Sequence, residues 1–287
     1  MEMPGCFFRS CLTQGRMLLI CSLLTSLSWG SMSSAANFQN ATEGNEFVMP
    51  AKIAKELSSQ DEIVRSGAVF DARDEIRRHS KGGAQRAINM IAEKLKDSSS
   101  YVRGAAASSL RDLGSLSLPA KDPLMEVIRS YPNSDASVSA IEALGSFESL
   151  GVDFQRELEW YLPLTKALSG VSTALNVLRQ CASEPLRPET ILYIEGVLER
   201  DQGNLLVVNA ALRCISKLSP SSKVLLKHLE AYANSDLIMR QFVVVECIRD
   251  NPKAFQKSDK EKVLAPLRNS KYFEVSSAAK NLSDGNN

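Results

Sequence analysis

The side chains that most often carry chemistry are few in this chain and stand apart from one another. There are two histidines, His79 at the end of a basic segment and His228 after a lysine in an amphipathic segment. Neither has a second histidine or a cysteine at the spacing that would place two ligands on one metal ion. We therefore predict no metal site, and we expect both histidines to be ordinary surface or helix-end side chains.

Three cysteines follow one another at a constant interval. Cys181, Cys214 and Cys247 are each 33 residues apart. This register favours three equivalent helices that each turn a small apolar thiol toward a core. Equivalent helices in a stack lie roughly 8–10 Å apart, whereas a disulfide needs Cα atoms within about 7 Å of each other. Free thiols are therefore expected. The alternative is one disulfide between two neighbouring cysteines, which a small shift between their helices would allow.

No pattern of a known catalytic or cofactor site is present. The chain lacks the nucleophile-elbow serine motif, the zinc-protease motif and the glycine-rich phosphate loops. Glu157 and Glu159 are two positions apart, which places them on different faces of a helix. We predict no catalytic residue, no cofactor and a protein that is not an enzyme. A carboxylate pair assembled between repeats is the enzymatic alternative.

Two local clusters are candidate binding patches. Phe154, Trp160 and Tyr161 crowd one predicted helix, and interface hot spots favour tryptophan and tyrosine. Burial between repeats would explain the same cluster. Arg77 and Arg78 lie in a basic stretch, which is either a solvated helix face or a docking patch for an acidic partner.

The elements that must position these residues recur about every 35 residues. Val64-Arg65, Val102-Arg103 and Met239-Arg240 each stand near the start of a segment with helical apolar spacing, and a small residue and then an apolar residue follow at fixed offsets. A fixed period of this length predicts stacked helical repeats. We expect helices at about 50–57, 61–79, 84–96, 100–113, 121–131, 135–148, 152–168, 170–182, 188–201, 204–218, 220–233, 236–250, 258–269 and 271–283.

This repeated pattern resembles the HEAT repeat family. In that family an aspartate closes the turn between paired helices, and Val-Arg opens the second helix before a small-residue stripe that ends in Ala-Leu-Gly. Asp61, Asp97 and Asp236 match the aspartate, and Ala143-Leu144-Gly145 matches the end. The resemblance implies an all-α fold, a right-handed α-solenoid of about seven HEAT-like helix pairs.

The match is incomplete in the middle of the array. Ser139, Ser172, Val208 and Ser276 replace the family's arginine, which interrupts the Asp–Arg ladder that the family builds between repeats. The exact repeat boundaries are therefore open. Armadillo and tetratricopeptide arrays are the fallback relatives.

The first residues have the order of a secretory signal peptide. Arg9 and Arg16 precede an apolar stretch at 17–27, and small residues lead up to a cut after Ala36. The apolar stretch is shorter than the roughly 20 residues that span a bilayer. We therefore expect an exported protein, periplasmic or secreted, with no membrane span after cleavage. The expected organisation is a signal peptide at 1–36, a flexible arm at 37–49, a repeat array at 50–283 and a polar tail at 284–287.

The charge balance limits the classes of partner. The chain has 34 lysines and arginines against 33 aspartates and glutamates, whereas nucleic-acid binding needs clustered positive charge. We predict a monomeric scaffold that binds a protein or peptide, and no nucleic acid, on the concave face formed by the second helix of each pair. A periplasmic inhibitor or immunity protein that blocks a toxic enzyme is the alternative. The predicted binding residues are Arg65, Arg103, Asn209 and Arg240.

Overall fold

A computed structural model of the chain describes residues 47–79, 84–147, 150–201 and 203–283. The predicted signal peptide, most of the predicted arm and the predicted tail lie outside these residues, so they stay predictions. Helices and turns account for the described residues, and no strand occurs among them. The prediction of an all-α solenoid is confirmed.

The helices follow the predicted order closely. They are α2 (Ala51–Glu56), α3 (Glu62–His79), α4 (Gln85–Glu93), α5 (Ser100–Leu113), α6 (Lys121–Ser130), α7 (Asp135–Gly145), α8 (Gly151–Tyr161), α9 (Leu168–Cys181), α10 (Pro188–Arg200), α11 (Leu205–Leu218), α12 (Lys223–Ala233), α13 (Ile238–Asp250), α14 (Lys257–Arg268) and α15 (Phe273–Ser283), with the 3-10 helices η1 (Lys94–Lys96) and η2 (Gly114–Ala120). Each even-numbered helix packs on the odd-numbered helix after it, so the described residues form seven helix pairs.

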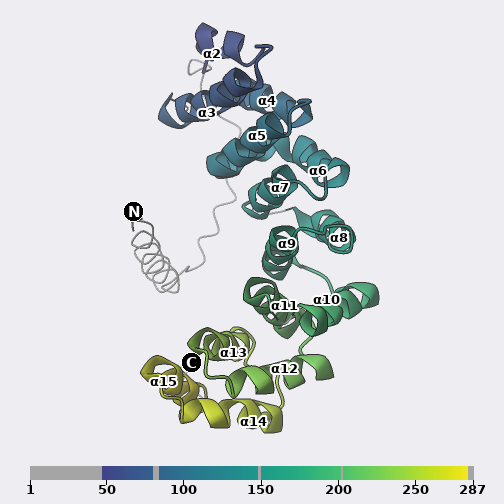
Figure 1. Ribbon diagram of the computed structural model, residues 1–287, viewed down its shortest axis with the longest axis vertical. Helices are drawn as coiled ribbons and strands as arrows, with labels where there is room; N and C mark the ends of the chain where they lie inside the picture. The colour runs from purple at the N-terminus through teal and green to yellow at the C-terminus, as the bar shows by residue number, and fades with distance from the viewer. Residues whose placement is uncertain (1–46, 80–83, 148–149, 202, 284–287) are drawn as a thin grey trace, which may run out of the picture. The chain divides into compact units, whose positions relative to one another are not determined.

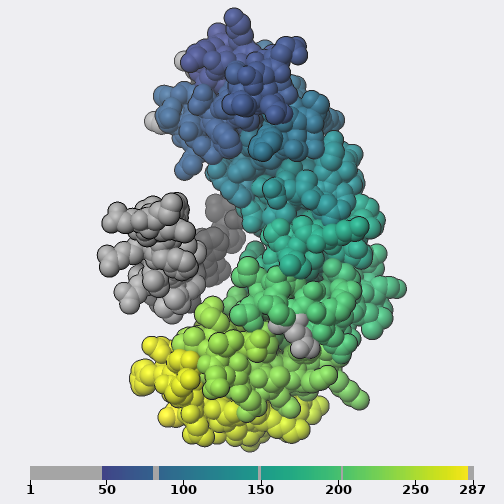
Figure 2. Space-filling view, in the orientation of Figure 1, coloured from purple at the N-terminus to yellow at the C-terminus, as the bar shows by residue number. Residues whose placement is uncertain are grey.

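The pairs build two layers (Figure 1). The odd-numbered helices from α3 to α15 form what we call the second-helix layer, in which α5 packs on α3 and α7, and α11 packs on α9 and α13. The even-numbered helices form the first-helix layer, where α4 and α6, or α10 and α12, contact each other over shorter stretches. The described repeats follow one another as a continuous stack in the space-filling view (Figure 2).

Small and large apolar residues alternate in the helices of the second-helix layer. Ala106, Ala140 and Ala174 are fully buried and let neighbouring backbones approach. Leu110, Leu144 and Leu178 are equally buried and fill the space to the next repeat. The residue spacing seen in the sequence therefore sets the distance between repeats.

The close approach explains the glycine that ends the Ala-Leu-Gly match. A Cβ atom on Gly145 would lie 2.8 Å from Val177 Cγ1, closer than real Cβ contacts come. Val177 is β-branched and has little freedom to move aside. Glycine at this position is thus a packing requirement between α7 and α9.

Two segments differ from the predicted helices. Helix α8 was expected to reach 168, but it ends at Tyr161, because Pro163 has no N–H to continue the hydrogen-bond ladder. The sequence predicts no helix at 114–120, between the helices expected at 100–113 and 121–131, yet these residues form the 3-10 helix η2. Gly114 enters η2 with a positive φ of 57°, and the Ser117 hydroxyl donates to the carbonyl of Leu110 at 2.7 Å.

Candidate functional site

Arg65, a predicted binding residue, joins two repeats. Its Nε and Nη2 donate to the two carboxylate oxygens of Asp97 at 2.8 and 2.9 Å, and its Nη1 donates to the carbonyls of Ser59 and Gln60 at 2.9 Å. The hydrogen bonds from Arg65 hold the pKa of Asp97 below its ordinary value, although burial acts in the opposite direction. The Arg65 guanidinium is therefore fully engaged within the fold.

The other predicted binding residues are also drawn into the stack. Arg103 Nη1 donates to two turn carbonyls at 2.8 Å, and its guanidinium lies 4.2 Å from the centroid of the Tyr131 ring. Arg240 lies 5.1 Å from the centroid of Tyr232, and Asn209 is half-buried in α11. A binding role requires these side chains to face solvent. Instead they are half-buried on four different helices, and the structure does not gather them into one site.

Large apolar side chains stand exposed at the starts of the second helices. Their exposed fractions run from 46% to 79%. Arg65 joins the start of α3 to the turn before α5, and Arg111 joins the end of α5 to the end of α7. Neighbouring second helices therefore run in the same direction, and these first turns line one edge of the second-helix layer. Helix α7 interrupts the series, because Ala136 and Ser137 are buried there. We call this set the apolar row, and its members are Ile63, Tyr101, Leu168, Leu206, Met239 and Phe273.

A groove of about 700 Å³ opens beside the N-terminal part of the apolar row. The aromatic rings of Phe70 and Tyr101 line it together with small residues, among them Gly104 and Ala105. A Cβ atom on Gly104 would meet no atom within 4 Å, so the groove lies open above this helix. The two aromatic rings lie beside polar side chains, among them Arg103, Asn133 and Asp135.

The side chains of the predicted aromatic and basic patches differ in their exposure. Tyr161 is fully buried, with its hydroxyl 3.3 Å from Thr165 Oγ1, so it belongs to the core and not to a surface patch. Trp160 is 43% exposed. Of the two alternatives that the sequence leaves open, a surface patch or burial between repeats, Trp160 therefore fits the surface patch. Arg77 and Arg78 are exposed at the end of α3, and Arg78 pairs with Glu75 at 2.7 Å.

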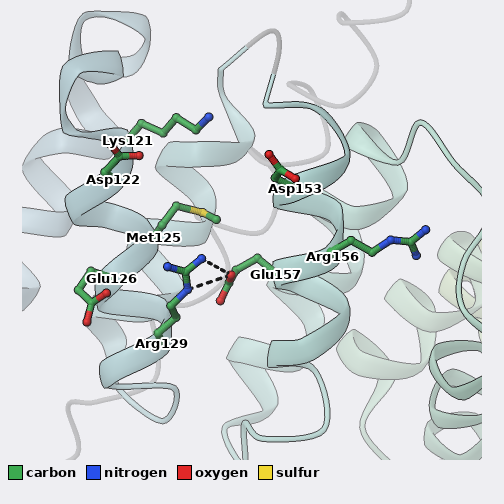
Figure 3. Close-up of a pocket in the computed structure, with 8 residues that line it drawn as sticks. All are labelled: Lys121, Asp122, Met125, Glu126, Arg129, Asp153, Arg156 and Glu157. Carbon is green, nitrogen blue, oxygen red and sulfur yellow. Dashed lines mark hydrogen bonds and ion pairs between the residues drawn. The ribbon is translucent and has the colours of Figure 1, made fainter.

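A groove of about 560 Å³ between α6 and α8 carries three basic and four acidic side chains (Figure 3). Arg129 of α6 and Glu157 of α8 face each other, with Arg129 Nε and Nη2 donating to Glu157 Oε2 at 3.0 and 2.7 Å. Met125 lies between this pair and Lys121. The charges nearly cancel, so the groove is suited to ion pairs with a partner of mixed charge.

Next to that groove, Glu159 is a fully buried carboxylate in α8. Its Oε1 accepts from Gln155 Nε2 at 3.0 Å and from Arg156 Nη1 at 2.9 Å. Its Oε2 accepts from the backbone N and Nε of Arg187 at 3.2 and 2.8 Å, and from Thr190 Oγ1 at 2.9 Å. Burial alone would raise the pKa of Glu159, but these hydrogen bonds together hold it below the ordinary value.

The cysteines and histidines do not assemble a reactive centre among the described residues. Cys181, Cys214 and Cys247 are free thiols, and burial raises their pKa values to about 11, 12 and 12. They therefore stay protonated and poorly nucleophilic at neutral pH. His228 is buried, which corrects the expectation of a surface side chain, and burial lowers its pKa. Within the ranges that the structure describes, no three His, Cys, Asp or Glu side chains are placed to hold a metal ion.

The fold and these surfaces define the class of the protein as an all-α helical-repeat solenoid. Neither a family model nor a curated protein sequence matches the chain. Among solved structures it is similar to a chain in the complex of CpcE and CpcF of phycocyanin lyase from Nostoc sp. PCC7120. The identity is 17%, the match covers 88% of this chain and 100% of that chain, and the TM-score is 0.34.

That comparison contradicts the prediction that the protein is not an enzyme, because the matched solved structure is that of a lyase. The lack of a catalytic motif in the sequence does not by itself exclude catalysis, and the prediction is not retained. Among the described residues, no helix is both long and apolar enough to cross a bilayer.

Proposed function

We propose that this chain is an exported scaffold that binds a protein or peptide along the edge of the second-helix layer. The observation that carries the proposal is the apolar row. Single exposed apolar residues are common on protein surfaces, but one recurs here in the first turn of every described second helix except α7, which is not random scatter. The proposal moves the contact from the predicted concave face to the edge where the second helices begin, and the binding residues from the arginines to the apolar side chains beside them.

Burial of these side chains supplies a physical reason for binding. Covering apolar surface contributes roughly 25 cal/mol per Å², and the largest contributions at interfaces come from a few aromatic and apolar anchors. Tyr101 is 77% exposed and borders the groove over α3, α5 and α7. It is the strongest anchor that the row offers.

The partner and its binding face are tested together by crosslinking and mass spectrometry on the exported protein. The partner found in this way is then titrated against the variants Tyr101→Ser and Leu206→Ser. Each should weaken binding by about tenfold or more, because each removes a contact worth over about 1.4 kcal/mol. Both side chains are largely exposed, so folding should be unaffected.

The matched control is Leu118→Ser, which removes an exposed leucine from η2, away from the apolar row. It should leave the affinity unchanged. Equal loss in all three variants, or no loss in any, would remove the second-helix layer as the binding face. A toxic enzyme as the crosslinked partner would make the protein an inhibitor.

Export is a separate expectation with its own measurement. The order of residues 1–36 supports cleavage after Ala36, because export enzymes cut after small residues that follow a short apolar stretch. Cell fractionation and N-terminal sequencing of the native protein should find a chain that begins at Asn37 outside the cytoplasm. A full-length chain that stays with the cytoplasmic fraction would contradict the proposal.

A further inference from the structure

A second apolar groove lies in the first-helix layer, between the end of α8 and the start of α10. It has a volume of about 520 Å³, and its apolar lining includes Trp160, Leu164, Leu192 and Tyr193. Trp160 is 43% exposed and Leu192 is 67% exposed. We call it the Trp160 groove.

The groove is distinct from the apolar row. The other large apolar side chains that stand exposed near the even-numbered helices of the described repeats are Val48 before α2, and Leu116 and Leu118 in η2. Trp160, Leu164 and Leu192 therefore form a local cluster on an otherwise polar layer. Tryptophan in such a cluster is the residue type most often found at the energetic centre of an interface.

One charged side chain of the groove is fixed in place. Arg187 lines it, and both its backbone N and its Nε donate to Glu159 Oε2, as described above. Glu159 itself is fully buried and anchored from α8, so it cannot turn away. The two terminal nitrogens of Arg187 have no partner among the described residues, and the side chain is 45% exposed.

This arrangement presents a pre-oriented guanidinium fork beside an apolar wall. Arginine forks match carboxylates with two parallel hydrogen bonds, and less side-chain freedom is lost when the fork is already held. Arg156, the other arginine on Glu159, has its terminal nitrogens taken by Glu159 and Glu184. Arg187 is thus the basic group of this cluster that is left for a ligand.

Glu189 also lines the groove and carries the opposite charge. It stands exposed in the first turn of α10, where no described side chain holds it. Its charge is therefore well solvated, and it adds little attraction for a cation. The fixed Arg187 fork outweighs it as the recognition element.

We propose that the Trp160 groove binds a partner segment in which a carboxylate stands beside a large apolar side chain. The apolar group lies against Trp160 and Leu192, and the carboxylate accepts hydrogen bonds from the terminal nitrogens of Arg187. This site is independent of the apolar row, so either can hold if the other fails.

The test uses the full chain with Trp29→Phe, which leaves Trp160 as the one tryptophan. Its emission is followed while an acetylated and amidated peptide, Gly-Ser-Leu-Phe-Glu-Leu-Gly-Ser, is added. We expect saturable binding in roughly the millimolar range or tighter. The peptide with glutamine in place of glutamate should bind about tenfold more weakly, since a charge-assisted pair is lost.

Arg187→Met should remove the preference for glutamate over glutamine, while the exposed Arg77→Met, far from the groove in α3, should keep it. Thermal unfolding of each variant shows whether it is folded. If Arg187→Met does not fold, the proposal is still tested by comparing the affinities of the glutamate and glutamine peptides for the chain with the unaltered groove. Three results would each overturn the proposal. They are equal binding of the glutamate and glutamine peptides, tighter binding of the peptide with lysine in place of glutamate, and no change in Trp160 emission when the glutamate peptide is added.

Discussion

Replacing Glu159 with alanine should lower the free energy of unfolding by about 3 kcal/mol, at the low end of the range for breaking a buried ion pair. The substitution leaves the Thr190 hydroxyl and Arg187 Nε without their acceptor inside the α8–α10 junction, and Gln155 Nε2 keeps only the Glu184 carbonyl. Because Arg187 is partly exposed, water can replace some of what is lost. Chemical denaturation followed by circular dichroism measures the change.

Glu184→Ala is the matched control. Glu184 also pairs with Arg156, at 3.1 Å, but its side chain is 53% exposed. An exposed pair contributes only about 0–1 kcal/mol, so the loss should be small. A loss as small for Glu159→Ala as for this control would show that the buried carboxylate does not hold the junction together.

The pH dependence of the same site has a definite sign. The pKa of Glu159 is lower in the folded protein than its ordinary value of 4.5. The unfolded chain therefore takes up a proton first, and the contribution of Glu159 to stability is present above about pH 4.5 and declines below it. The stability difference between the native chain and Glu159→Gln should shrink as the pH falls through this window.

Two glycine-to-alanine substitutions should change stability in opposite directions. A Cβ atom on Gly170 would lie 2.5 Å from the Tyr161 hydroxyl and 2.7 Å from Thr165 Oγ1. Tyr161 is a rigid and fully buried ring, so Gly170→Ala should cost roughly 1–3 kcal/mol through overpacking. Gly104 has no atom within 4 Å of such a Cβ, and Gly104→Ala should add about 0.5–1 kcal/mol through helix propensity.

Equilibrium denaturation of both variants, with unchanged dependence on denaturant, measures the two shifts. Each variant serves as the control for the other, because the chemical change is the same. Shifts of the same sign would mean that local space around the glycine does not decide the outcome.

The sequence predicted the repeat geometry well because that geometry depends on short-range spacing. The pairing of Arg65 with Asp97 agrees with the ladder that the family resemblance implies, and the alanine and leucine stripes appear where the 34-residue spacing places them. The start of α10 at Pro188 follows from residue chemistry that acts within one turn.

The surfaces could not be predicted in the same way. Trp160 and Tyr161 are neighbours in α8, yet one is exposed and the other fully buried. One residue is a rotation of about 100° on a helix, so exposure depends on a helix phase that two adjacent aromatic residues do not define. The donors to Glu159 Oε2, Arg187 and Thr190, are about 30 positions away, and no local pattern marks such a carboxylate as buried.

The interruption of the apolar row at α7 has a consequence for any long partner. Ile63 and Tyr101 form one stretch, and the members from Leu168 to Phe273 form another. A partner that reaches both stretches is held bivalently, and once one is engaged the second meets it at a high effective concentration. Losing either stretch would then raise the dissociation rate far more than it would lower the association rate. A partner too short to cross α7 would gain nothing from the second stretch.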